Sequence, residues 1–220
     1  RPKAWHSGAS ARNAFDEDAD ELPRPSPEGR HRVIKPWKIL SSRPVISDQY
    51  ITMRTDSCER SDGHIVPTYH VIDFPMWTLV VPLTDEGNIV LVREYRHPAN
   101  VIVTGIPGGG GEPDETDFEA IGRRELVEET GYTPREMHHI GRCYPNPATQ
   151  TNQINFFLAL GCVRTTEQSL DANEQIEVLE MPFADYLRYE DMSVQHSHHA
   201  AALYYTERYF LKHPELRPTA

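Results

Sequence analysis

The sequence has few cysteines and no long apolar run, and each of these absences excludes a class of protein. The three cysteines, Cys58, Cys143 and Cys162, are odd in number and lack the spacing of metal ligands, which indicates reduced thiols and a cytoplasmic location. No apolar run approaches the ~20 residues that span a bilayer. The n-region and h-region of a signal peptide are also missing, although a chain that starts at Arg1 is compatible with earlier removal of a leader.

Positive charge is in deficit, because 22 lysines and arginines face 33 aspartates and glutamates. The resulting net charge of −11 argues against binding to a nucleic-acid backbone. For an anionic substrate, arginines and a bound metal would have to supply the local positive charge. We therefore expect no nucleic acid and no membrane as partner.

Composition divides the 220 residues into three parts. Residues 1–32 are rich in proline, serine and charge and lack periodicity, so they are expected to form a flexible N-terminal tail. Residues 33–75 contain two expected strands, Tyr50–Arg54 and His64–Phe74, joined near Ser61-Asp62-Gly63. Residues 76–220 are expected to form the larger domain.

The stretch from Pro107 to Tyr132 carries the clearest signal. It opens with four glycines, which allow positive φ angles and close approach of the backbone to a ligand. A helix is expected from about Asp117 to Thr130, with Thr116 and Glu119 forming a capping box and Gly131 ending it.

Three acidic side chains of this helix, Glu125, Glu128 and Glu129, fall within an arc of roughly 100°. Like charges at this spacing repel, and they lie near the helix C-terminus, where anions are disfavoured. A hard divalent cation such as magnesium would resolve the repulsion. The alternative is an ordinary solvated charged face, which is the usual meaning of a charge run. The preceding glycines and the apolar neighbours Phe118 and Ile121 favour the cation.

The stretch resembles the Nudix box: Gly, five residues, Glu, seven residues, then Arg-Glu-aliphatic-x-Glu-Glu-x-Gly-aliphatic. The second half matches from Arg124 to Tyr132, and the first half matches with Gly109 and Glu115. Eight residues rather than seven then precede Arg124, so strict counting would place the first glutamate at Thr116. We interpret this as a one-residue insertion between loop and helix.

The resemblance implies an α/β fold, the Nudix-type α/β/α sandwich with a mixed sheet, plus a small N-terminal β-strand region. It implies Mg²⁺, or Mn²⁺ in its place, held by Glu125, Glu128 and Glu129 with Glu115 and the Gly108 carbonyl contributing. Arg124 would orient the glutamates by ion pairing, so the expected catalytic set is Arg124 with the three helix glutamates.

Upstream of the box, Trp77–Leu83 and Ile89–Tyr95 are expected to form a hairpin around Thr84–Asn88, with the first strand buried on both faces. Arg93 and Arg96 end the second strand, which resembles a substrate-binding strand of the ADP-ribose pyrophosphatase branch. For each arginine, a structural salt bridge is an equally good interpretation.

The chain also departs from that branch. Gly105 replaces a glutamate of the Glu-Leu-Pro-Ala-Gly segment, and Asn152 replaces a loop glutamate that is a candidate base. An amide cannot take a proton at neutral pH, so the base is either a box glutamate or another acid such as Glu174 or Glu177. Pro147, fifteen residues after the box, matches the branch and joins Arg93, Arg96 and Gly109 as an expected substrate-binding residue.

Two features remain with alternatives open. The region 33–75 resembles the N-terminal region that often forms a homodimer in that branch, or it merely extends the sheet. Two further helices are expected at Pro182–Tyr189 and Ser197–Leu211. The cluster His196, His198 and His199, at the start of the second helix, invites a zinc site. Without cysteines or a second ligand pair, a structural role is the better interpretation.

The resemblance implies a metal-dependent hydrolase of a small nucleotide substrate, a nucleoside diphosphate linked to another group. ADP-ribose or an ADP-sugar is the leading candidate, giving AMP and a sugar phosphate. One rival is a Nudix enzyme for another substrate, such as a dinucleoside polyphosphate or another nucleotide sugar. The other is a non-catalytic ADP-ribose-binding domain.

Overall fold

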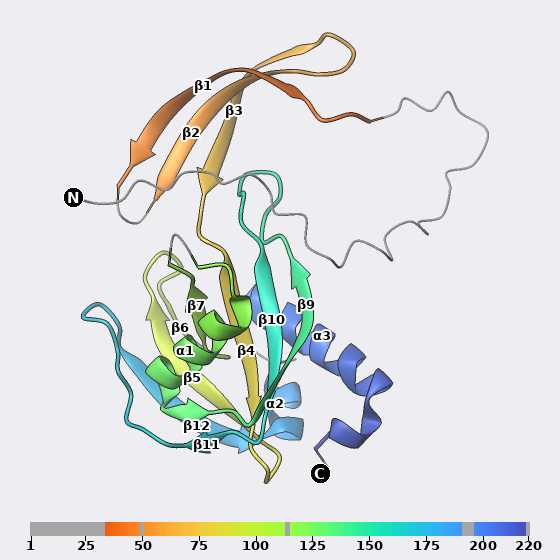
Figure 1. The fold of residues 1–220 in the computed structure, drawn as a ribbon. Helices are drawn as coiled ribbons and strands as arrows, with labels where there is room; N and C mark the ends of the chain where they lie inside the picture. Colours follow the sequence, from red (N-terminus) through yellow and green to blue (C-terminus); the bar gives the residue numbers. More distant parts are fainter. Residues whose placement is uncertain (1–33, 49–50, 113–114, 191–195, 219–220) are drawn as a thin grey trace. The chain divides into compact units, whose positions relative to one another are not determined.

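The computed structural model describes residues 34–48, 51–112, 115–190 and 196–218. Contacts divide the chain into two units: one comprises Arg1–Phe74 with Thr149–Thr151, and the other comprises Pro75–Ala148 with Asn152–Ala220. The tail expected at 1–32 lies outside the described residues (Figure 1).

The first unit contains a three-stranded antiparallel sheet in the order β1-β2-β3. Its strands are β1 (Lys38–Ser47), β2 (Thr52–Glu59) and β3 (Ile65–Asp73). The predicted turn at Ser61–Gly63 is confirmed, and Gly63 has a φ of +82°. Strand β1 was not predicted, because the Ser-Ser-Arg-Pro segment at 41–44 breaks the apolar alternation that signals a strand.

The second unit contains a seven-stranded mixed sheet in the order β12-β5-β4-β10-β9, with β6 pairing β5 and β7 pairing β4. Its strands are β4 (Trp77–Leu83), β5 (Asn88–Arg96), β6 (Val101–Gly105), β7 (Gly108–Gly110), β9 (Glu136–Cys143), β10 (Ile154–Leu160) and β12 (Ile176–Pro182). Strands β4 and β10 pair in parallel, and the other pairs are antiparallel. A short ladder joins β8 (Tyr132–Thr133) to β11 (Val163–Arg164).

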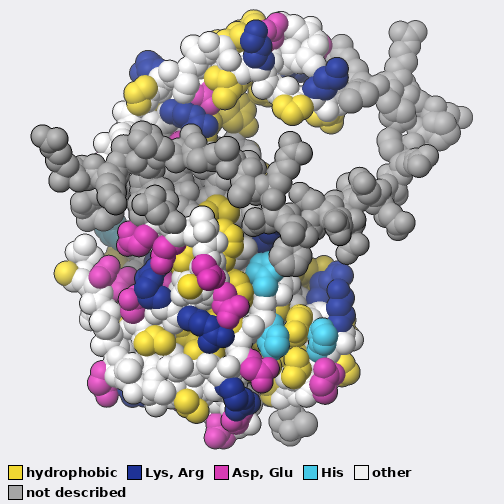
Figure 2. Space-filling view, viewed as in Figure 1, with side chains coloured by type: hydrophobic (Ala, Val, Ile, Leu, Met, Phe, Trp, Pro, Cys, Tyr) yellow, Lys and Arg dark blue, Asp and Glu magenta, His cyan; other side chains and the backbone are white. Residues whose placement is uncertain are grey.

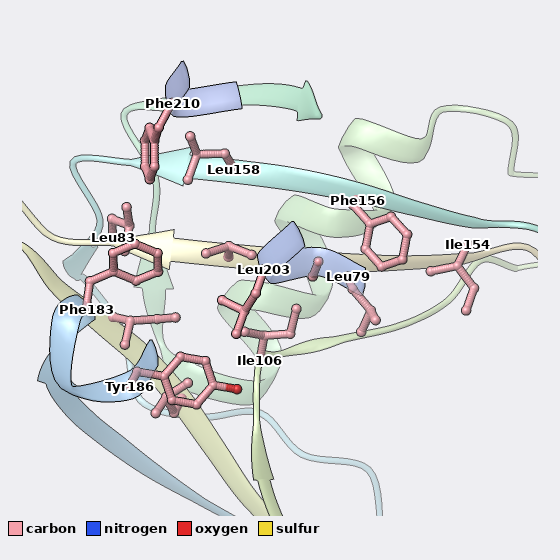
Figure 3. Close-up of a cluster of buried hydrophobic side chains, with 14 residues drawn as sticks. Leu79, Leu83, Ile106, Ile154, Phe156, Leu158, Phe183, Tyr186, Leu203 and Phe210 are labelled. Atoms are coloured by element: carbon pink, nitrogen blue, oxygen red, sulfur yellow. The ribbon is translucent and has the colours of Figure 1, made fainter. Parts of the chain in front are cut away.

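Helices cover both faces of this sheet. Side chains alternate along a strand, so Val80 packs with Leu126 of α1 (Phe118–Thr130), whereas Leu79 and Leu83 pack on the other face. That second core includes side chains of α2 (Phe183–Glu190) and α3 (Ser197–Lys212), as Figure 3 shows. The 3₁₀ turn η2 (Pro214–Leu216) follows α3. The expected α/β/α sandwich with a mixed sheet is confirmed.

Strand β4 is buried on both faces of the sheet, as its apolar sequence predicted. Every residue from Thr78 to Leu83 is buried, and the Thr84–Asn88 hairpin leads into β5. None of the helices in the described ranges combines the length and apolar character needed to cross a bilayer.

The ends of α1 confirm one prediction and correct another. Gly131 has a φ of +77° and donates its N–H to the Val127 carbonyl at 2.8 Å, so it ends the helix as expected. The capping box at Thr116 is wrong by one residue, because Asp117 is the N-cap and accepts the Ala120 N–H at 3.0 Å.

Part of the glycine run forms a strand, which the sequence pattern did not predict. Gly108–Gly110 forms β7 and pairs with Trp77–Leu79 of β4. At Gly108, φ is +148°, and an added Cβ would lie 2.2 Å from the Thr78 carbonyl oxygen. Only glycine fits this close approach, which brings β7 alongside the buried centre of the sheet.

Candidate active site

Glu129 is the most buried acidic side chain of the box and is anchored to the glycine strand. Its Oε2 accepts a hydrogen bond of 2.8 Å from the Gly108 main-chain N–H. Burial, with a smaller contribution from the neighbouring Glu125, raises the pKa of Glu129 to about 8, against the lowering effect of the Gly108 hydrogen bond. A charged carboxylate here is therefore costly without a cation.

Glu125 lies one helical turn earlier and also faces the glycine strand. A Cβ added to Gly109 would lie 2.4 Å from Glu125 Oε2, so the absence of a side chain at Gly109 makes room for this carboxyl group. Burial raises the pKa of Glu125 to about 7, although the Arg124 guanidinium acts in the opposite direction. Two adjacent, desolvated carboxyl groups thus line one side of β7.

Arg124 forms ion pairs with three acidic side chains of the motif. Its guanidinium pairs with Glu125 and Glu128 at 2.9 Å each and with Glu115 at 3.4 Å. It also donates to the Gly110 carbonyl at 3.3 Å. Glu128 is 42% exposed, in contrast to Glu125 and Glu129. The structure therefore brings together the motif's arginine, its acids and the glycine strand.

These residues fit a divalent cation that is completed by substrate. Within the described ranges, no three acidic, histidine or cysteine side chains converge as a preformed cation cage. Magnesium, however, is usually held through one or two carboxylates plus phosphate oxygens and water. The mutual repulsion of Glu125 and Glu129, which raises the pKa of Glu129, is the strain that such an ion would relieve.

Glu94 belongs to the same acidic surroundings, and sequence reasoning assigned it no role. Burial raises the pKa of Glu94, and its charge in turn raises that of Glu129. The available signal was the alternation along β5: Val90 packs on the α1 face, and Glu94 lies four residues later on that face. Figure 2 shows acidic and basic side chains interspersed over the α1 side of this unit.

The two arginines of β5 are both engaged in ion pairs. Arg93 pairs with Glu177, its cross-strand neighbour on β12, and Arg96 pairs with Glu94. The structural salt bridge is therefore present at both positions. Arg96 lies beside the acidic side chains because it pairs with Glu94. Arg93 is the residue next to Glu94 along β5, so its side chain lies on the opposite face of the strand.

The candidate bases differ in their surroundings. The Glu177 carboxylate accepts hydrogen bonds from the Arg93 guanidinium. Asn152, which stands where the branch has a glutamate, is buried, and its Oδ1 has no hydrogen-bond partner among the described residues. The charge of Glu174 raises the pKa of both Glu125 and Glu129, so Glu174 lies within electrostatic reach of the pair.

Pro147 is exposed in the loop between β9 and β10. Strand β10 starts at Ile154, which pairs with Trp77, and Trp77 pairs with Gly110. This loop and the glycine strand therefore lie at the same end of the sheet.

The three histidines lie at the start of α3 and do not form a zinc site with other described residues. His196 is the N-cap and accepts the His198 N–H at 3.3 Å. His199 is buried against the sheet. Their arrangement agrees with the structural interpretation.

A cavity of about 250 Å³ lies at the other end of the sheet. It is lined by the β4–β5 turn, by Arg135 and by residues of η2, among others. Leu83, at the end of β4 remote from Trp77, forms part of its wall. The candidate site residues therefore do not line this cavity.

Comparison with known proteins places this geometry in a family. Residues 75–203 match the NUDIX domain model, and residues 37–72 match the nucleoside diphosphate sugar hydrolase N-terminal domain model. The chain is 29% identical over 153 residues to the ADP-ribose pyrophosphatase of Bacillus subtilis, covering 69% of this chain and 81% of that protein. It is 31% identical over 155 residues to the GDP-mannose pyrophosphatase of Cronobacter sakazakii, covering 65% and 80%.

A crystal structure of an ADP compounds hydrolase superposes with a TM-score of 0.72 at 21% identity, covering 83% of this chain and 98% of that one, and so shares the fold. The domain match extends over more than half of the sequence and includes the whole acidic helix. The chain therefore belongs to the Nudix family and is a Nudix hydrolase.

Proposed function

We propose that the chain hydrolyses the diphosphate bond of ADP-ribose or an ADP-sugar, giving AMP and a sugar phosphate. The observation that carries the proposal is the pair of desolvated carboxyl groups, Glu125 and Glu129, held against the glycine strand. Relatives named as ADP-ribose pyrophosphatase and GDP-mannose pyrophosphatase support a nucleotide-sugar substrate.

Nudix hydrolases generally need a divalent metal, and we propose Mg²⁺, with Mn²⁺ as a substitute. Glu125 and Glu129 would hold it, with Glu128, Glu115 and the Gly108 carbonyl as further ligands. When bound, the ion supplies positive charge for the diphosphate and lowers the pKa of a bound water. The chain's own contribution is to hold the carboxylates: the Gly108 N–H orients Glu129.

Arg124 restrains three further carboxylates of the site by ion pairing. It pairs with Glu125 and Glu128 on its own helix and with Glu115 from the preceding loop. We assign it to the catalytic set for this orienting role. Guanidinium geometry matters here because its planar fork can serve several carboxylates at once.

Substrate contacts are proposed for four positions. Arg96 is the best placed, because its ion pair with Glu94 holds a cationic group beside the acidic site. Gly109 offers backbone without a side chain, and Pro147 lies in a loop at the same end of the sheet. Arg93 would have to leave Glu177 and cross to the other face of β5.

For the base, Glu174 is favoured over Glu177. Glu174 is within electrostatic reach of Glu125 and Glu129, whereas Glu177 is held by Arg93. A Glu174→Gln variant should lose turnover and retain substrate affinity. If its turnover equals that of the unchanged chain, a box glutamate is the base instead.

We also propose a homodimer formed through the region 33–75, with 76–220 as the catalytic domain. The support is the exposure of Ile39, Leu40, Val45 and Ile46, all on β1. Light scattering on the intact chain tests this, since a monomer at micromolar concentration would overturn it. A cytoplasmic location without nucleic-acid or membrane partners completes the proposal.

A second candidate is a Nudix hydrolase that prefers another nucleotide sugar or a dinucleoside polyphosphate. Gly105 and Asn152 depart from the ADP-ribose branch, and the GDP-mannose pyrophosphatase relative favours this alternative. A non-catalytic ADP-ribose-binding domain is disfavoured, because pure binding does not require such a concentration of acidic side chains.

The deciding experiment is a hydrolysis screen with magnesium or manganese. ADP-ribose, other ADP-sugars, GDP-mannose, a dinucleoside polyphosphate and nucleoside triphosphates are offered, and the products are separated by anion exchange. AMP and a sugar phosphate from ADP-ribose are expected, with Glu129→Gln as the inactive control. Tight binding of ADP-ribose in calorimetry without turnover of any substrate would overturn the proposal.

A further inference from the structure

Gly105 and His199 share a space that holds only one side chain. Gly105 ends β6, and a Cβ built on it would lie 1.9 Å from His199 Cε1 and 2.0 Å from His199 Nδ1. Real Cβ atoms do not approach other atoms so closely. The imidazole ring from the first turn of α3 therefore occupies the position where a side chain at 105 would begin.

His199 is held firmly in this space. Its exposed fraction is 7%, and Leu203, one turn later on α3, belongs to the buried core together with Ile106, the residue after Gly105. Its Nδ1 has no hydrogen-bond partner among the described residues. The contact between His199 and Gly105 is therefore steric packing rather than a hydrogen bond, and it lies where α3 and β6 pack together.

The segment that His199 presses on leads directly to the acidic pair. Between Gly105 and Gly108 lie only Ile106, which is buried, and Pro107, whose carbonyl accepts the Val80 N–H at 3.0 Å. Gly108 then donates its N–H to Glu129. A displacement of β6 at Gly105 would reach the Glu129 carboxyl group through three residues of constrained backbone.

We propose that His199 is a positioning residue for the hydrolytic site, because its ring fills the side-chain space of position 105 and so fixes the segment 105–108 that orients Glu129. The inference rests on the proposed function for its kinetic consequence. It assigns to α3 a part in the geometry of a site whose acids all come from other elements.

The pairing has a consequence for the glutamate that the ADP-ribose branch carries at this position. A glutamate at 105 cannot be accommodated while His199 is present, because even its Cβ would overlap the ring. Gly105→Glu should therefore lower activity rather than restore a substrate contact. Removal of the ring should relieve part of this loss.

The test is a double-mutant cycle of Gly105→Ala and His199→Ala in the full chain, with His199→Leu as the matched control of similar volume. Two readouts are taken: kcat and KM for the nucleotide sugar that the unchanged chain hydrolyses, and amide hydrogen exchange of residues 105–110. Measurements are made well below the Tm of each variant, so that global unfolding does not contribute.

For His199→Ala we expect kcat to fall about tenfold with KM changed less than threefold, together with faster exchange at Gly108. His199→Leu should stay near the unchanged chain in both readouts, because it refills the space. The double variant should be more active and more stable than Gly105→Ala, since the added methyl group enters the space that the ring has left.

Unchanged kcat and unchanged exchange in His199→Ala would overturn the proposal and leave His199 a purely structural residue. Strictly additive losses in the cycle, or a His199→Leu variant as impaired as His199→Ala, would overturn it too. The exchange readout needs no substrate. If the unchanged chain hydrolyses nothing, the proposed function fails, while exchange at Gly108 still decides the role of His199.

Discussion

The main-chain N–H of Gly108 donates a 2.8 Å hydrogen bond to Oε2 of Glu129, across 21 positions of sequence. This bond ties the glycine strand β7 to the last turn of α1. It directs the carboxyl group of a residue that is 8% exposed and that has acidic neighbours at Glu125 and Glu94. The acidic helix and the glycine run therefore act as one structural unit.

Replacement of Glu129 by glutamine should remove activity and keep the fold. The amide oxygen still accepts the Gly108 N–H, but the negative charge is lost, so we expect kcat to fall at least 100-fold, on the order of the loss of a key electrostatic group. Because burial penalises the charged carboxylate, the Tm of the metal-free variant should equal or exceed that of the unchanged chain. Steady-state hydrolysis and thermal unfolding measure the two effects. Near-normal turnover would contradict the assignment.

Replacement of Arg124 by lysine should weaken the site although it keeps the charge. Lysine is a point charge and cannot serve Glu125, Glu128 and Glu115 together with the Gly110 carbonyl. Hydrogen bonds to charged groups contribute about 1.5–3 kcal/mol each, so we expect kcat/KM to fall about 10- to 100-fold. Arg123→Lys is the matched control, since Arg123 pairs with the exposed Glu119 one turn away. Equal losses in the two variants would show that the position of the arginine is unimportant.

Replacement of Gly131 by alanine should destabilise the protein more than replacement of Gly161. Both glycines have positive φ, +77° and +61°, so each alanine costs about 1–2 kcal/mol of strain. At Gly131 the new Cβ would also lie 2.2 Å from the Thr166 carbonyl oxygen, which is backbone and cannot turn away. At Gly161 it would meet the Arg135 guanidinium, the far end of a flexible side chain. Thermal unfolding should place Gly131→Ala several degrees lower, and equal Tm values would refute the steric argument.

The contribution of His199 to stability should be lost as pH falls below about 6.5, whereas the raised pKa values of Glu125 and Glu129 act in the opposite direction over the same range. Burial, together with the nearby charges of His196, Arg96 and His198, lowers the pKa of His199 to about 3. The unfolded chain therefore binds a proton near pH 6.5, whereas the folded chain does not. The stability that the neutral His199 contributes is complete above pH 6.5 and is lost progressively toward pH 3. The slope from this one group is at most about 1.4 kcal/mol per pH unit. In thermal scans from pH 7.5 to 5, the Tm of the unchanged chain should fall relative to that of His199→Leu as pH decreases. Identical slopes would contradict the burial of a neutral imidazole.

Local patterns in the sequence were sufficient for much of this molecule. The acidic face of α1, its end at Gly131 and the buried β4–β5 hairpin follow from helical and strand periodicity, which act over a few neighbouring residues. The spacing of the box acids, together with Arg124, also identified the residues that the structure brings together. Such features need no knowledge of distant partners.

Other features depend on contacts between residues far apart in the chain, and no local pattern encodes them. The glycine run forms a strand because it pairs with Trp77–Leu79 of β4. Glu94 lies near the acidic side chains of α1 because β5 passes beside that helix. His199 meets Gly105 across 94 positions, where packing of α3 on the sheet leaves room for one side chain. The sequence thus determines which groups the site contains. Packing of the sandwich determines which of them are desolvated, paired or pressed against one another, because burial and steric exclusion arise only when the layers close.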